Sequence, residues 1–180
     1  MVISKQSMPE SNNQNFNHLK IHTQYSICEG AIKIDNLKDF CKENKIPCLG
    51  LSDTSNLCGA LEFAENISKV GTQPIIGTQI FFRFEDTTGL LPLIALNEKG
   101  YKKIIELSSR SYLENDALSD PHLDIKELLI DTEGVSLLSG TIQGLFGKLF
   151  EKGRIDEISK IYKSLSSKFN DNFYLEIQRH

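Results

Sequence analysis

Residues 48–80 read CLGLSDTSNLCGALEFAENISKVGTQPIIGTQI and contain the clearest fold signal in the chain. The apolar run at 48–52 predicts a buried strand that places Asp53 at its carboxyl end. We expect a helix over residues 59–70, ended by Gly71, and a second strand within PIIGTQIFFRF at 74–84. A strand, a helix and a strand in this order are typical of a βα unit and of a parallel sheet.

The same alternation continues on both sides of this unit. Upstream, we expect a strand at 18–23 and a helix at 36–44 with Asp35 as its N-cap. Downstream, the pattern predicts a hairpin of runs 74–84 and 90–96 with a turn at 86–89, then a helix at 99–111, a strand at 135–140, helices at 144–152 and 156–169, and a strand at 173–177. The sequence thus predicts an α/β fold with a largely parallel sheet.

The last predicted strand has no helix after it. A closed βα barrel typically needs about 250 residues and a neighbour on each side of every strand. We therefore interpret the 180 residues as the front part of a longer domain.

The slightly acidic net charge argues against one class of function, non-specific DNA binding. The chain has 20 Lys and Arg residues against 24 Asp and Glu, for a net charge of −4. This balance argues against a sequence-independent DNA-binding surface, because such affinity comes from basic side chains that displace counterions from phosphates. We expect contact with DNA only through other parts of a larger protein.

Cysteine spacing and the amino-terminal residues indicate a cytoplasmic protein. The four cysteines, at 28, 41, 48 and 58, form no C-x-x-C pair, which argues against a zinc ribbon or a redox motif. Residues 1–16 are rich in Asn, Gln and Ser and lack the apolar segment of a secretory signal, so we interpret them as a flexible arm. We find no apolar run of 18 residues, and predict no membrane contact.

Several polar side chains are candidates for a site. In a strand, His18, Lys20 and His22 would share one face, and Asp53 would reach the same rim because functional groups collect at the carboxyl ends of parallel strands. At a dielectric constant of 20, two unit charges 4 Å apart repel by roughly 4 kcal/mol, and an ammonium beside a divalent ion by about twice that. We therefore predict that Lys20 excludes a metal and pairs with Asp53 in its place.

Structural roles for these residues remain open. His18 and His22 fit satisfied structural histidines, Asp53 fits a cap for the following helix, and Glu176 fits a solvated or salt-bridged side chain. The G-x-S-x-G, Walker and dinucleotide-binding motifs are absent from the sequence.

Five segments in order resemble one family: HLKIHTQYSICEGAIKI at 18–34, the stretch 49–80, LIALNEKGYKKIIELSS at 93–109, LLSGTIQGLFGKLF at 137–150 and FYLEIQRH at 173–180. Together they resemble the amino-terminal PHP domain, polymerase and histidinol phosphatase type, of bacterial DNA polymerase III alpha subunits. This resemblance covers about residues 16–180 and implies a distorted (βα)7-type barrel, incomplete at the carboxyl end, in which residues 17–180 are a partial PHP domain without polymerase palm, fingers and thumb.

The resemblance also implies a metal site that this sequence has lost in part. Lys20 replaces the first histidine of a His-x-His motif, Thr54 replaces a histidine after Asp53, and Gln79 replaces a carboxylate. The remnant site implied by the resemblance consists of His18, Lys20, His22, Asp53, Thr54, Gln79 and His180. Because a catalytic metal needs at least three protein donors, we expect no metal and no catalytic residue in this chain.

The function implied is that of a degenerate PHP domain. It would serve as a scaffold for the rest of a DNA-directed DNA polymerase, whose nucleotidyl transfer uses Mg²⁺, and as a docking module for the proofreading exonuclease subunit. The alternative is a metal-dependent phosphoesterase or 3′–5′ exonuclease that uses His18, His22, Asp53 and His180, of which His22, Asp53 and His180 match the family's ligand positions. A small-molecule phosphatase is disfavoured by the polymerase-like segments at 57–63 and 97–104.

Overall fold

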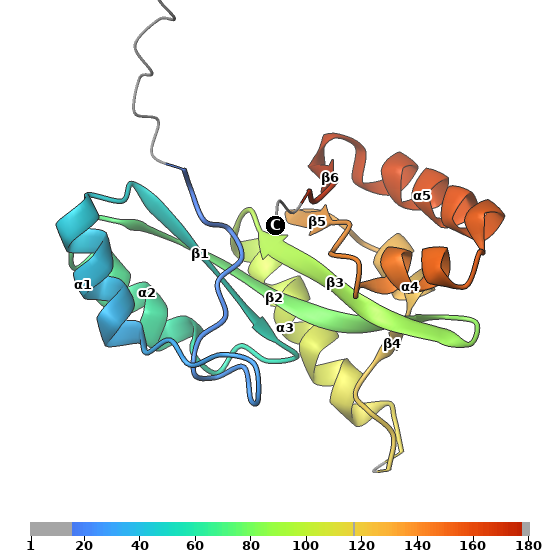
Figure 1. Cartoon of the computed structure of the whole chain (residues 1–180), viewed down its shortest axis with the longest axis horizontal. Helices are drawn as coiled ribbons and strands as arrows, with labels where there is room; N and C mark the ends of the chain where they lie inside the picture. The colour runs from blue at the N-terminus through green and yellow to red at the C-terminus, as the bar shows by residue number, and fades with distance from the viewer. Residues whose placement is uncertain (1–15, 117, 178–180) are drawn as a thin grey trace, which may run out of the picture.

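The computed structural model describes residues 16–116 and 118–177, and its centre is a six-stranded sheet in the order β1-β2-β3-β5-β6, with β4 paired to β2 (Figure 1). The arm predicted at residues 1–16 lies outside the described residues except for Phe16. The α/β class is confirmed. The sheet is mixed rather than largely parallel, and it is not closed.

The βα unit predicted from residues 48–80 is confirmed. β1 (Cys48–Thr54), α2 (Ala60–Ser68) and β2 (Gln73–Phe84) follow one another, and β1 pairs with β2 in parallel so that Thr54 lies opposite Gln79. Helix α1 (Ile34–Asn44) packs beside α2 over the same end of the sheet (Figure 1). Asp35 is not the N-cap of α1, because the helix begins one residue earlier, after Lys33.

The predicted hairpin forms, but its turn is shorter and earlier than expected. β2 and β3 (Thr87–Ala95) are antiparallel and are joined by Glu85 and Asp86, with Glu85 at φ 53°. Gly89 therefore lies inside β3 and not in the turn. A Cβ on Gly89 would come within 2.4 Å of the Leu145 backbone, so this glycine permits the close approach of helix α4.

The carboxyl-terminal half completes the sheet and covers it with helices. α3 (Glu98–Leu113) has Asn97 as its N-cap, and the Asn97 side chain accepts a hydrogen bond from Gly100 N at 3.0 Å. The remaining elements are β4 (Leu123–Asp124), the 3-10 helix η1 (Ile125–Leu129), β5 (Val135–Leu138), α4 (Leu145–Glu151), α5 (Ile155–Phe169), η2 (Asn170–Asn172) and β6 (Phe173–Tyr174). The two-residue strand β4 was not predicted, since its residues lie in a polar stretch.

The two ends of the sheet are less regular than the sequence pattern suggests. Residues 18–23 run along β1 and form two isolated parallel bridges, Ile21 with Leu51 of β1 and Thr23 with Ile32, instead of a full strand. Gly50 N donates to His18 O at 2.7 Å, and a Cβ on Gly50 would lie 2.4 Å from Leu19 O. At the other end, β6 stops at Tyr174 rather than at residue 177.

Two hydrophobic clusters stabilise this arrangement. The smaller one joins α1 and α2 to β1 through residues such as Phe63 and Leu51, and the larger one joins α3, α4 and α5 to β2, β3 and β5. Leu57, in the loop before α2, packs against both clusters. Each large side chain buried in them contributes about 1.5–3 kcal/mol.

Ion pairs connect the tip of the β2–β3 hairpin to the junction between α4 and α5. Asp86 Oδ2 lies 3.2 Å from Lys152 Nζ, and Asp86 Oδ1 also pairs with Arg154. Hydrogen bonds from Lys152 and Arg154 hold the pKa of the Asp86 carboxyl below its usual value. A carboxyl group whose pKa is lowered by folding adds stability above its unfolded pKa of about 3.9 and loses it as the pH falls through the folded value.

We predict that Asp86→Asn lowers the free energy of unfolding at pH 7, and that the difference from wild type shrinks below about pH 4. Urea denaturation at neutral and acid pH measures this difference. The control is Asp171→Asn, at an exposed carboxylate in η2, which should show little change at either pH. A difference in the free energy of unfolding between Asp86→Asn and wild type that stays constant with pH would show that the Asp86 carboxylate is not its source.

Candidate functional site

Asp53, at the end of β1, is fully buried and accepts three hydrogen bonds. Its Oδ1 accepts from Thr23 N at 2.6 Å and from Ser26 Oγ at 2.6 Å, and its Oδ2 accepts from Thr23 Oγ1 at 2.8 Å. Both carboxylate oxygens are therefore engaged by the loop that follows residue 22. Asp53 does not cap the next helix, whose N-cap is Gly59.

These bonds order the loop between residues 23 and 30. Ser26 Oγ also accepts from Thr54 N at 3.1 Å, and Gln24 N donates to Ile32 O at 2.9 Å. A Cβ on Gly30 would come within 1.9 Å of Thr23 O, so the loop folds tightly against itself. This fold presents Glu29 to the end of β1.

Four side chains form a ring at that position. Thr54 Oγ1 donates to Glu29 Oε2 at 2.5 Å and lies 3.4 Å from Gln79 Nε2, which donates to it. Gln79 Nε2 is also 3.3 Å from His22 Nε2, and His22 Nδ1 is 4.0 Å from Glu29 Oε2. The Gln79 amide nitrogen can only donate, so in this contact His22 Nε2 is the acceptor.

Lys20 lies outside this ring. Its ammonium forms an ion pair with Glu176, which follows β6, and not with Asp53. The predicted ion pair of Lys20 with Asp53 is therefore wrong. Asp53 is unsuitable because its oxygens already accept bonds from Thr23 and Ser26.

The two remaining predicted residues do not join the group. His18 is exposed and packs edge-on against the Phe16 ring, with centroids 4.9 Å apart. His180 lies outside the described residues. The structure therefore brings His22, Thr54 and Gln79 together, places Asp53 beside them in a separate hydrogen-bonded group, and separates His18 and Lys20 from them.

Glu29 is the member of the site that sequence reasoning missed. It lies in an irregular loop after Cys28, which has φ 65°, so neither helical nor strand periodicity marks it. A neighbouring residue, Tyr25, donates its hydroxyl to Glu62 Oε2 at 2.5 Å, and this hydrogen bond raises the pKa of the Tyr25 hydroxyl. Tyr25 thereby ties the same loop to α2.

Among the described residues, the side chains around Asp53 do not form a metal-binding group. Across residues 16–116 and 118–177, no group of three or more His, Cys, Asp and Glu side chains is arranged to hold a metal ion. Asp53 would have to break three hydrogen bonds to serve as a ligand, and Lys20 brings a positive charge to the neighbouring strand. Thr54 and Gln79 offer only neutral oxygens, which a zinc ion does not favour.

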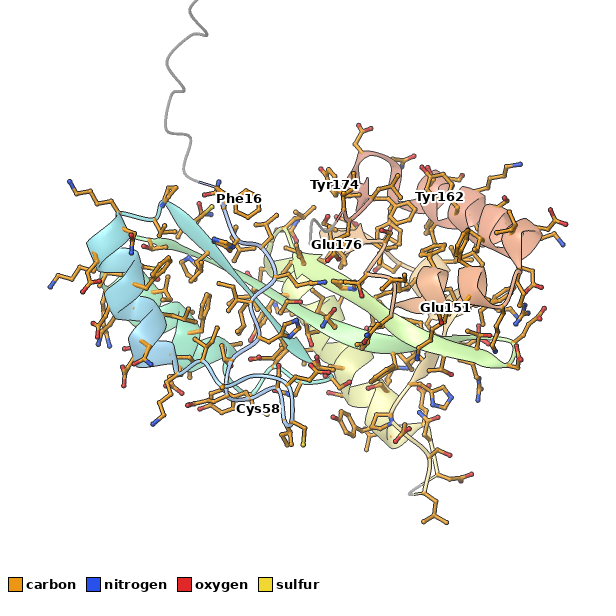
Figure 2. The ribbon with its side chains drawn as sticks, in the orientation of Figure 1. Phe16, Cys58, Glu151, Tyr162, Tyr174 and Glu176 are labelled. Atoms are coloured by element: carbon orange, nitrogen blue, oxygen red, sulfur yellow. The ribbon has the colours of Figure 1, made fainter. Side chains whose placement is uncertain are left out.

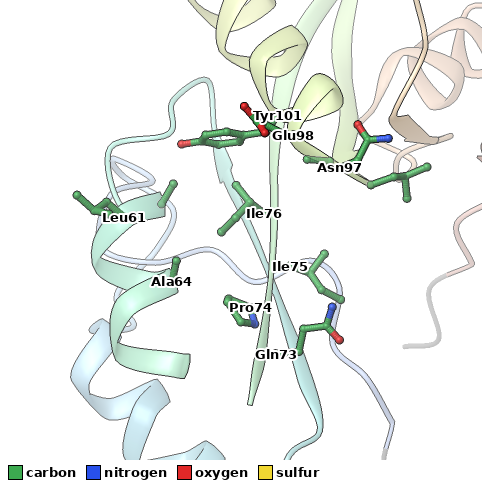
Figure 3. Close-up of a pocket in the computed structure, with 12 residues that line it drawn as sticks. Leu61, Ala64, Gln73, Pro74, Ile75, Ile76, Asn97, Glu98 and Tyr101 are labelled. Atoms are coloured by element: carbon green, nitrogen blue, oxygen red, sulfur yellow. The ribbon is translucent and has the colours of Figure 1, made fainter. Parts of the chain in front are cut away.

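A separate apolar cavity of about 440 Å³ lies between α2 and the start of α3 (Figure 3). Leu61 and Ala64 of α2 line one side, Ile76 of β2 lies across from them, and Tyr101 of α3 stands at the rim (Figure 3). It shares no residue with the ring of His22, Glu29, Thr54 and Gln79. Its apolar lining suits packing rather than acid–base chemistry.

The model of the PHP domain family matches residues 18–180. The chain belongs to the PHP domain family. As a PHP domain it is 37% identical over 182 residues to DNA polymerase III subunit alpha of Caulobacter vibrioides, with 96% of this chain and 16% of that protein covered. It is 34% identical over 176 residues to the same subunit of Borreliella burgdorferi, with 92% of this chain and 15% of that protein covered.

The chain thus spans about a sixth of the length of these relatives. Among solved structures, an amidohydrolase from Chromobacterium violaceum covers 82% of this chain and 54% of its own, at 12% identity and a TM-score of 0.41. Those values are too low to support a shared activity. None of the helices in the described part of this PHP domain is long and apolar enough to cross a membrane.

We predict that Asp53→Asn lowers the free energy of unfolding by about 2–4 kcal/mol, because an amide group would turn a donor toward Thr23 or Ser26. Urea denaturation gives the value. Asp35→Asn is the matched control, since Asp35 is an exposed partner of Lys38 at 3.6 Å, and it should cost less than about 1 kcal/mol. Equal effects of the two substitutions would show that the three bonds to Asp53 contribute little.

Proposed function

We propose that this PHP domain is the amino-terminal part of a replicative DNA polymerase alpha subunit and acts there as a scaffold and docking module, not as a phosphoesterase. The observation that carries the proposal is that the side chains of the site bond to one another. Asp53 is engaged by Thr23 and Ser26, and Thr54 and Gln79 are engaged with Glu29 and His22. The similarity to polymerase alpha subunits supplies the wider setting.

Within such a polymerase, this domain would contact the rest of the chain and the proofreading exonuclease subunit. Template-directed nucleotidyl transfer would use two Mg²⁺ ions held by carboxylates of a palm domain elsewhere in the protein. Contact with DNA would pass through those other domains, in keeping with the net charge of −4. DNA replication by such a subunit would place this chain in the cytoplasm.

The phosphoesterase alternative is less well supported by the same contacts. Of the ligands it would need, His18 is on the surface beside Phe16, and Asp53 is committed to three donors. His22 is held by Gln79 at 3.3 Å. A general base or a nucleophile must be free to meet the reacting group, and these side chains are already used.

We predict that the purified chain, supplied with Mn²⁺ or Zn²⁺, hydrolyses bis-p-nitrophenyl phosphate no faster than buffer with the same metal. A metal-dependent phosphoesterase in the same assay is the positive control. Hydrolysis that requires metal and disappears in both His22→Ala and Asp53→Asn would establish the enzymatic alternative in place of the scaffold role.

Docking is tested separately. We predict that the chain and the proofreading exonuclease subunit of the same organism elute together in size-exclusion chromatography and give saturable heat in titration calorimetry. Binding should persist in Thr54→Val, because docking does not depend on the chemistry of the ring. Failure of the exonuclease subunit to bind both this chain and the full-length polymerase subunit would refute the docking role.

A further inference from the structure

Lys20 and Glu176 come from opposite ends of the sheet. Lys20 lies in the segment that runs along β1, and Glu176 follows β6, the last strand on the other side. Figure 2 labels Glu176 and Phe16, which belong to these two ends, and both residues line one cavity of about 410 Å³. The ion pair therefore crosses the place where the sheet remains open.

This ion pair is more buried than the others in the described residues. The side chains of Lys20 and Glu176 are 16% and 14% exposed, whereas those of the Lys102–Glu98 pair on α3 are 71% and 80% exposed. Leu19, Leu138 and Leu175 line the cavity beside the pair, and of these Leu138 is half-buried whereas Leu19 and Leu175 are exposed. Because the two charged side chains are themselves mostly buried, water screens their attraction less than it does at the surface, so removal of one partner costs more than at an exposed pair.

The backbone around Glu176 is also held in place. Glu176 N donates to Ser139 Oγ at 2.9 Å, and Ser139 N donates to Tyr174 O at 2.9 Å. Ser139 continues the pairing of β5 and β6 with its side chain just before the chain turns at Gly140, which has φ 76°. The Glu176 carboxylate is thus directed to Lys20 by a fixed strand end.

We propose that Lys20 supplies from within the chain the positive charge that joins the segment beside β1 to the residues after β6 through Glu176, across the open side of the sheet. The ammonium does the cross-linking that a divalent cation could do between carboxylate and imidazole groups at strand ends, and its charge disfavours such a cation nearby. The stability of the domain is therefore independent of metal ions. This inference concerns contacts inside the chain and does not depend on the docking role.

A double-mutant cycle on the 180-residue chain tests the proposal. Lys20→Met and Glu176→Leu should each lower the melting temperature by roughly 5–10 °C, because each removes one side of the ion pair that crosses the opening. The combination Lys20→Met with Glu176→Leu should melt within about 3 °C of wild type, since paired apolar groups replace a buried ion pair at little cost. Wild type should melt at the same temperature in zinc chloride, manganese chloride and EDTA.

Matched controls separate this ion pair from general charge effects. Lys102→Met and Glu98→Leu remove an exposed pair on α3 and should each shift melting by no more than about 2 °C. If the single variants at 20 or 176 do not fold, the charge-reversed variant Lys20→Glu with Glu176→Lys should fold and melt above either single variant.

Three results would overturn the proposal. One is a double variant that loses the sum of the two single losses, which means that the residues act independently. Another is a charge-reversed variant that fails to recover folding or stability. The third is a wild-type melting temperature that rises with zinc or manganese, or metal that copurifies at one equivalent, because the site would then take its cation from solution.

Discussion

The buried carboxylate of Asp53 is the constraint on which the candidate site depends. A charge with no exposed surface is tolerated only if donors surround it, and here Thr23 and Ser26 provide three of them. These donors belong to a loop that is far from β1 in sequence. Their hydrogen bonds to Asp53 therefore hold that loop against the end of β1. The loop then carries Glu29 to Thr54, and the ring with Gln79 and His22 follows.

The regular part of the fold could be predicted from the sequence because its signals are local. Apolar spacing at Leu37, Phe40 and Cys41 marks α1, and a continuous apolar run marks β1. The ends of the sheet could not be predicted in this way. Whether residues 18–23 or 175–177 complete a strand depends on partners distant in sequence, and at β6 the backbone pairing gives way to the side chain of Ser139. Gly89 misled the turn prediction because its role is close packing against Leu145.

The candidate site also has a part that could be predicted from local sequence signals and a part that could not. Thr54 and Gln79 meet because parallel pairing of β1 and β2 sets them side by side, and that pairing follows from the βα pattern. Glu29 and the choice of Glu176 by Lys20 depend on the path of irregular segments, which composition and periodicity do not encode. The expected Lys20–Asp53 pair assumed that side chains at the same edge of the sheet contact one another. In the structure the loop after residue 22 encloses Asp53, and Lys20 pairs with Glu176 from the opposite edge.

A chain can belong to the PHP family without hydrolysing phosphoesters, as we propose here. Family membership reflects the backbone fold, whereas the reaction depends on which side chains occupy the strand ends. A strand-end site needs positive charge or hydrogen bonds to hold carboxylates together, and a metal ion is one way to supply them. In this chain the Lys20 ammonium pairs with Glu176, and the hydroxyl groups of Thr23 and Ser26 donate to Asp53. Such contacts can hold strand ends together without a metal ion, and the proposed scaffold role needs no more than that. The proposed scaffold role therefore depends on contacts that maintain the fold, and it places no demand on the chemistry of the donors.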